Sequence, residues 1–111
     1  MTRIALKRDK LFGYSEIKIV GHSGYSEEGS DIVCAYISSA TDLLMSILID
    51  EFGLEIETDI DPESALVCLR VSPTSDNEAK ADIISGVTAG FASQMKELSN
   101  QFSQYVSIKI V

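Results

Sequence analysis

The hydrophobic spacing of the sequence changes period several times along the chain, and this change constrains the fold more than any other feature. Some segments alternate apolar and polar residues, which is the period of a half-buried β-strand. Others repeat apolar residues at every third or fourth position, which is the period of a helix with one buried face. The predicted strands are residues 3–8, 14–21, 54–58, 65–71 and 105–111, and the predicted helices are residues 31–52 and 77–102.

This order of elements predicts an α/β (α+β) fold. We expect a two-layer sandwich, in the order ββαββαβ, in which a mostly antiparallel five-stranded sheet carries two helices on one face. The length of 111 residues suits one hydrophobic core, and no linker or repeat divides the chain. Residues 1–111 are therefore expected to form a single cysteine-containing domain.

The ends of the predicted helices carry suitable residues. Ser30 suits the N-cap of the first helix, Asp31 suits its positive first turn, and Gly53 suits the residue that ends it. In the second helix, Gly86 and Gly90 lie one turn apart and permit close approach of another helix. If this surface of the second helix, or the free face of the sheet, is apolar, a second copy of the chain is expected to cover it. This predicts a homodimer.

The chain is acidic, with 9 Lys and Arg residues against 17 Asp and Glu residues and a net charge of −8. This balance argues against a direct nucleic-acid partner, because phosphate binding uses clustered basic residues. An acidic surface attracts basic proteins, although it also keeps soluble proteins dispersed. The N-terminal segment lacks a secretion signal, and polar residues within 38–42 interrupt the longest apolar stretch. We therefore expect no membrane association and a cytoplasmic location.

Residues 20–40, VGHSGYSEEGSDIVCAYISSA, contain the candidate catalytic side chains. Cys34 falls in the first turn of the predicted helix, where N–H groups and the helix dipole favour a thiolate. His22 is the only histidine of the chain, and its side-chain type exchanges protons near neutral pH. A thiolate attacks a carbonyl carbon and an imidazole protonates the leaving amine, so this pair fits nucleophilic catalysis.

Asp31 lies one turn before Cys34, and its charge has two opposite effects. It opposes the thiolate by like-charge repulsion, yet it can orient a protonated His22 as the third member of a triad does. It can also act only as a cap of the helix. Backbone N–H groups near Cys34 are the expected oxyanion site.

Other residues of the chain add to this interpretation. Gly21, Gly24 and Gly29 allow positive φ angles and a close approach of the loop to a ligand. Cys68 lies within an apolar strand segment and is expected to be core packing. No Cys-x-x-Cys pair and no metal-ligand spacing occurs, so neither a metal nor a cofactor is expected.

The string GHSGYSEEGSDIVCAYIS closely resembles the signature of the ribosomal-processing cysteine protease (Prp) family, and the similarity extends over essentially the whole chain. The resemblance implies that His22 and Cys34 form the catalytic pair, that Asp31 supports them, and that the loop 21–29 is a lid over the substrate. It also implies a homodimer that removes an N-terminal extension from large-subunit ribosomal protein number twenty-seven, a strongly basic protein, by cutting after a Phe-Phe pair. By the same resemblance, this cut is expected to be needed for ribosome assembly.

The same resemblance suggests where the substrate binds. The predicted substrate-binding residues are Gly21, Gly24, Tyr25, Gly29, Tyr36 and Ser38. Tyr25 or Tyr36 is the candidate lining of an apolar pocket for the aromatic pair. Tyr36 replaces the smaller residues common in the family, which affects the shape of the pocket and not the chemistry.

Two other function classes fit the same residues. A ribosome-associated binding module without enzymatic activity would hold the ribosomal protein as a partner and would not need Cys34. A thiol-based redox sensor would use a reactive Cys34 that forms a sulfenic acid or a disulfide, and it would need His22 little.

Overall fold

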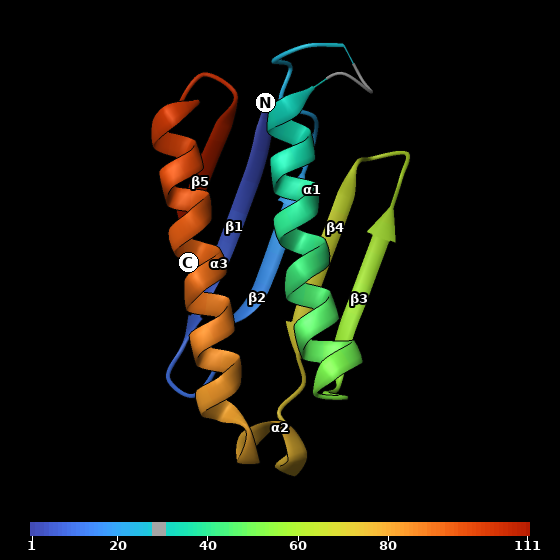
Figure 1. The fold of residues 1–111 in the computed structure, drawn as a ribbon, viewed down its shortest axis with the longest axis vertical. Helices are drawn as coiled ribbons and strands as arrows, with labels where there is room; N and C mark the ends of the chain where they lie inside the picture. Colours follow the sequence, from blue (N-terminus) through green and yellow to red (C-terminus); the bar gives the residue numbers. More distant parts are fainter. Residues whose placement is uncertain (28–30) are drawn as a thin grey trace.

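The computed structural model describes residues 1–27 and 31–111. Its five strands are β1 (Thr2–Asp9), β2 (Gly13–Val20), β3 (Ile56–Asp61), β4 (Leu66–Val71) and β5 (Val106–Ile110). They form one sheet in the order β3-β4-β2-β1-β5, in which only the β1–β5 pair is parallel (Figure 1). The predicted mostly antiparallel five-stranded sheet is confirmed.

The helices lie together on one face of this sheet (Figure 1). They are α1 (Ile32–Met45), which continues into the π-helical segment η1 (Ser46–Glu51), the short α2 (Ser75–Ala79), and the long α3 (Ala81–Gln101). The core fills the space between the two layers. Its most buried apolar side chains include Ile4, Leu6, Val33, Leu48, Ile84, Met95 and Val106. The two-layer α+β sandwich predicted from the sequence is therefore confirmed.

Some predicted boundaries are wrong. The predicted helix 77–102 is two helices, because α2 starts earlier and Lys80 adopts a non-helical conformation between α2 and α3. Thr74 caps α2 by accepting the N–H of Asn77 at 3.2 Å. The predicted strand 54–58 is also shifted, since β3 runs from Ile56 to Asp61. All residues of β3 pair with β4, with Asp61 opposite Leu66, and this pairing keeps the polar residues 57–59 and 61 in the strand.

Helix α1 is apolar on more than its buried side. Residues 32–51 are long and hydrophobic enough to cross a membrane by length and composition alone. The core helix of a soluble protein passes the same test, and α1 packs Val33, Ile37 and Leu44 into the core. Its outer side nevertheless leaves Leu43 61% exposed.

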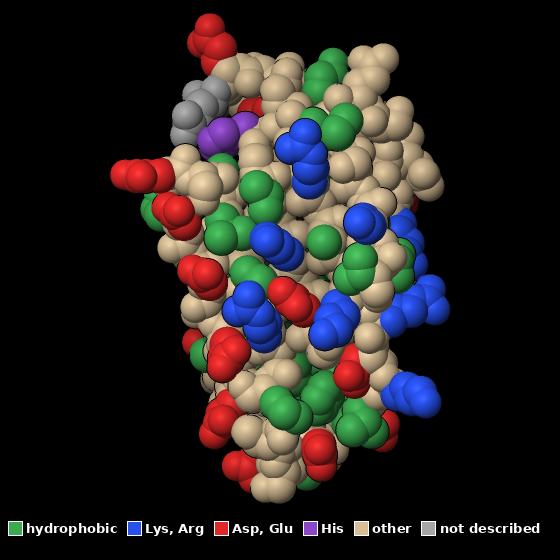
Figure 2. Space-filling model, turned by 180° about the vertical axis from the view of Figure 1, so that it is seen from behind, with side chains coloured by type: hydrophobic (Ala, Val, Ile, Leu, Met, Phe, Trp, Pro, Cys, Tyr) green, Lys and Arg blue, Asp and Glu red, His purple; other side chains and the backbone are tan. Residues whose placement is uncertain are grey.

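The other face of the sheet is open and carries charged side chains among apolar ones (Figure 2). Strand register places Arg3, Lys7 and Lys18 on this face, where their pairing partners across β1 and β2 are Val20, Glu16 and Ala5. Figure 2 shows Lys and Arg side chains gathered over its middle, with Asp and Glu side chains along one margin. Arg70 of β4 pairs with Glu16 of β2 at 3.5 Å. Charged residues at alternate positions keep this face solvated.

Candidate active site

The start of α1 sets the position of the candidate nucleophile. Asp31 is the N-cap residue, and its Oδ1 accepts the backbone N–H groups of Val33 at 2.9 Å and of Cys34 at 3.0 Å. The prediction that Ser30 caps this helix is therefore wrong, and Ser30 itself lies outside the described residues. Because the cap is one residue later than predicted, Cys34 is the third helical residue, still within the first turn.

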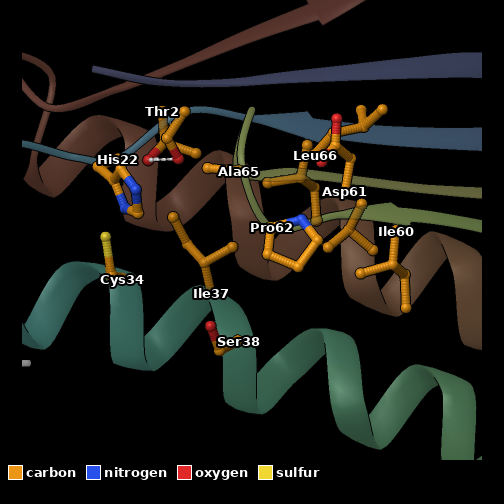
Figure 3. A pocket seen from close by; sticks show the side chains of 13 residues that line it. Thr2, His22, Cys34, Ile37, Ser38, Ile60, Asp61, Pro62, Ala65 and Leu66 are labelled. Carbon is orange, nitrogen blue, oxygen red and sulfur yellow. Dashed lines mark hydrogen bonds between the residues drawn. The ribbon is translucent and has the colours of Figure 1, made fainter.

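The loop after β2 brings His22 to the same place. In Figure 3 the imidazole of His22 and the thiol of Cys34 point toward one another across the end of a cavity. Gly21 anchors the loop, since its N–H donates to the carbonyl of Ala65 at 3.0 Å. Its φ is +93°, and an added Cβ would lie 2.8 Å from the Met1 carbonyl oxygen. Only glycine fits this position without strain.

Ser23 joins this site, although the sequence analysis did not single it out. Its backbone N–H donates to the Cys34 Sγ at 3.3 Å, and its hydroxyl donates to the Asp31 Oδ2. The hydroxyl also accepts the Tyr25 N–H at 3.2 Å. A single serine in a glycine-rich loop has no sequence pattern that would have indicated these contacts.

Asp31 is buried and ionised. Burial by itself raises the pKa of this carboxyl, but hydrogen bonds from the Ser23 hydroxyl and the Cys34 backbone outweigh it and lower the pKa from 3.8 to about 2. Among the described residues, its hydrogen bonds go to the helix start and the Ser23 loop, and none joins it to His22. The geometry thus fits the capping alternative rather than the triad alternative.

The expected oxyanion site near Cys34 stays a prediction. Two backbone donors of the first turn, the N–H groups of Val33 and Cys34, are bound by the Asp31 carboxylate. They are not free to bind an oxyanion in this conformation. The cap and the oxyanion site compete for the same donors because a helix offers only a few unpaired N–H groups at its start.

A first hollow of about 280 Å³ extends from His22 and Cys34 along the sheet side of α1 (Figure 3). Its lining is mostly apolar and combines β2, α1 and the β3–β4 hairpin. The lining residues are Thr2, Ile19, Gly21, His22, Cys34, Ile37, Ser38, Ile60, Asp61, Pro62, Ala65, Leu66 and Val67. A bulky apolar side chain bound here would lie beside the thiol.

A second hollow of about 360 Å³ lies on the other side of the thiol. It is lined by Gly24, Ser26, Asp31 and Ala35, and it shares His22, Cys34 and Ser38 with the first hollow. His22 and Cys34, the candidate catalytic pair, therefore lie where two hollows meet. An extended chain can occupy both while its backbone passes over Cys34.

The other predicted substrate-binding residues divide into two groups. Gly21, Gly24 and Ser38 line the hollows, and Gly29 lies outside the described residues. Tyr25 packs edge-to-face on Phe102 and Tyr105, with ring centroids 5.6 Å and 5.2 Å apart.

Neither Tyr25 nor Tyr36, the two candidate linings of the aromatic pocket, lines a hollow beside Cys34. Tyr36 is 57% exposed on the outer side of α1. The predicted aromatic lining is thus replaced by aliphatic side chains such as Ile37 and Ile60, because helix periodicity turns Tyr36 away from Cys34.

The second cysteine fits its predicted packing role. Cys68 is 1% exposed in β4, and its thiol donates to the Glu16 carboxylate at 3.5 Å. Burial raises the pKa of this thiol. Both cysteines are free. Among the described residues, no group of His, Cys, Asp and Glu side chains has the arrangement of a metal site.

Comparisons with known proteins agree with this geometry. A search of curated proteins finds no significant match. The Staphylococcus aureus essential ribosomal processing protease Prp, solved with a covalently linked product peptide, has a TM-score of 0.83 at 16% identity, covering 100% of both chains. The same protease with a substrate peptide has a TM-score of 0.78 at 14% identity, again covering 100% of both chains.

A Streptococcus mutans protein has a TM-score of 0.84 at 21% identity, covering 100% of this chain and 94% of the other. These structural matches show a shared fold. The sequence model of the cysteine protease Prp family matches residues 1–107, which is nearly the whole chain. The chain therefore belongs to the cysteine protease Prp family and is a cysteine protease.

Proposed function

We propose that this protease removes the N-terminal extension of large-subunit ribosomal protein number twenty-seven, cutting after a Phe-Phe pair, and that ribosome assembly needs this cut. The observation that carries the proposal is the position of His22 and Cys34 at the meeting point of two hollows, one of them lined mostly by apolar side chains. A solved structure of an S. aureus relative contains a substrate peptide, which supports a peptide ligand for this fold.

The proposed reaction uses two steps of acyl transfer. The Cys34 thiolate attacks the scissile carbonyl carbon, forming a C–S bond and moving an electron pair onto the carbonyl oxygen. When the C–N bond breaks, His22 as an imidazolium gives its proton to the leaving amine. His22 then takes a proton from water, the resulting hydroxide attacks the thioester, and Cys34 leaves as a thiolate.

The hollows support the proposed specificity. Ile19, Ile37 and Ile60 provide apolar contacts for an aromatic side chain beside the cut. By the same family resemblance, the extension ends in a Phe-Phe-Ala-Ser-like sequence. Gly24 and Ser26 in the second hollow suit the small Ala and Ser residues that follow the cut. An acidic protein also attracts a basic substrate protein at long range.

A cleavage assay tests this function. The protein is incubated with a peptide that has a Phe-Phe-Ala-Ser core, and the products are identified by mass spectrometry. We expect cleavage after the second Phe by the native protein and by Cys68→Ala, and none by Cys34→Ala or with an Ala-Ala-Ala-Ser peptide. Binding without cleavage by the native protein would contradict the proposal and favour the binding module.

We also propose that the protease is a homodimer without a direct nucleic-acid or membrane partner. A third hollow of about 320 Å³ lies between α1 and α3, lined by Leu43, Ile47, Gly86 and Gly90 among others. A Cβ at either glycine would meet no atom within 4 Å, so this chain leaves the surface open. An exposed apolar face of this kind is typical of an interface.

Light scattering after size-exclusion chromatography tests the dimer. The native protein should have twice the mass of one chain, and Leu43→Glu should have the mass of one chain. A monomeric native protein, or one that sediments with lipid vesicles, would contradict this part of the proposal. We further propose a cytoplasmic location, which the two free cysteines support, since thiols stay reduced there.

A further inference from the structure

Ser23 is a buried polar residue in an otherwise accessible loop. Its exposed fraction is 2%, whereas His22 and Gly24 on either side are exposed. A buried hydroxyl without partners would destabilise the loop, but this hydroxyl has two. It donates to the Asp31 Oδ2 and accepts the Tyr25 N–H.

The directions of these hydrogen bonds follow from the protonation of Asp31. Because the pKa of Asp31 is about 2, its carboxylate only accepts hydrogen bonds at neutral pH. The single proton of the Ser23 hydroxyl therefore goes to Asp31, and a lone pair of the same oxygen is left for the Tyr25 N–H. The Ser23 hydroxyl, the Asp31 carboxylate and the Tyr25 N–H thus all have hydrogen-bond partners at once, which holds the loop on the start of α1.

The main chain of Ser23 completes a closed ring with the nucleophile. Its N–H donates to the Cys34 Sγ at 3.3 Å, while the Cys34 N–H donates to Asp31 at 3.0 Å. The ring thus passes from the Cys34 backbone through Asp31 and Ser23 back to the Cys34 sulfur. A hydrogen bond to an ionised acceptor is stronger than one to a neutral acceptor, so this N–H holds the Cys34 sulfur most strongly when the sulfur attacks as a thiolate.

We infer that Ser23 is a positioning residue of the protease: its hydroxyl holds the His22 loop on the α1 cap, so that its own N–H supports the Cys34 thiolate. The same anchor places His22, the preceding residue, beside the sulfur (Figure 3). This inference deepens the proposed role of Cys34 as the nucleophile and rests on it.

Alkylation by iodoacetamide tests the inference without any substrate. The rate at Cys34 is followed by peptide mass spectrometry from about pH 6 to about pH 10, because the thiolate is the reacting form. The buried Cys68 is the internal reference for intact protein. For Ser23→Ala we expect an alkylation rate about three- to tenfold lower at about pH 7 and a profile displaced to higher pH by about half a unit to one unit.

Two further variants separate positioning from general damage. Ser39→Ala removes an exposed hydroxyl from α1 and should leave the profile unchanged. Ser23→Thr keeps the hydroxyl and should restore the native profile. A Ser23→Ala profile that coincides with the native one would overturn the inference, whatever its melting temperature.

A measurement on the unmodified protein covers the case in which Ser23→Ala does not fold. The amide resonance of Ser23 in nuclear magnetic resonance spectra should move with pH together with the ionisation of Cys34, and that of Ser39 should not. A Ser23 amide that does not respond would overturn the inference. If the native protein fails to cut the Phe-Phe peptide while Ser23 responds as expected, the proposed substrate is wrong and the role of Ser23 stands.

Discussion

Replacing glycine by alanine at three positions should change stability in opposite directions. Gly86 and Gly90 lie inside α3, and an added Cβ would meet no atom within 4 Å at either position. Gly53, after η1, also has open space around it, but its φ is +59°. The three substitutions add the same methyl group without a clash, so only the backbone conformation separates them.

The magnitudes follow from the backbone. Alanine in a helix interior is more stable than glycine by about 1 kcal/mol, so Gly86→Ala with Gly90→Ala should raise the free energy of unfolding by about 2 kcal/mol. Gly53→Ala should lower it by about 1 kcal/mol, because left-handed backbone disfavours a Cβ. For a chain of this size, the double variant should melt roughly 5 to 10 °C higher.

The assay is urea unfolding followed by far-ultraviolet circular dichroism, since the chain contains 0 Trp residues. It is run at concentrations where light scattering shows single chains, so that stability is not mixed with association. If Gly86→Ala destabilised the single chain, the α1–α3 hollow would be closed within one copy and the reasoning would fail. If the proposed second copy packs its helices into this hollow, the same double variant should also weaken dimerisation.

Three further predictions concern single side chains. Asn77→Ala should lower the free energy of unfolding by about 2 to 3 kcal/mol, because the buried side-chain amide accepts the Glu55 N–H and donates to two backbone carbonyl groups. The exposed Asn100→Ala is the control in the same denaturation assay. The carboxyl of Asp31 has a lower pKa in the folded protein than in the unfolded chain. Its contribution to the free energy of unfolding is therefore complete above about pH 4 and is lost as pH falls toward about 2. Curves of unfolding free energy against pH for the native protein and Asp31→Asn should therefore converge as pH falls over this range. A constant separation between the two curves would refute this role of ionised Asp31. Ile60→Asp, at a 57% exposed position of the first hollow, should raise KM for the Phe-Phe peptide about tenfold while the melting temperature changes little; an unchanged KM would remove the hollow from the substrate path.

The sequence predicts the elements of this fold better than their ends. Alternation and helical spacing are local properties, so both layers follow from them. Ser30 and Asp31 are adjacent and both are good capping residues, which is why the sequence alone could not choose between them. Strand β3 carries acidic residues at an edge of the sheet, and only its pairing with β4 shows that it extends to Asp61.

The candidate site was predictable where it depends on chain neighbours. His22, Asp31 and Cys34 lie within a short stretch, and the structure brings them together. The apolar hollow was not predictable, because Ile60 and Leu66 reach it from a hairpin distant in sequence. The hydrogen bonds of Ser23 were not predictable for another reason. They depend on the geometry of the loop, which hydrophobic spacing does not encode.

The first two residues of the chain have a practical consequence for protein production. Thr2 lines the first hollow, and the Met1 carbonyl lies against Gly21 at the start of the loop that carries His22. A purification tag fused before Met1 would emerge at the entrance to the hollow, where it would compete with substrate like a tethered inhibitor. Since β5 runs parallel to β1, a tag after Val111 begins farther along the sheet, away from Met1 and from this hollow.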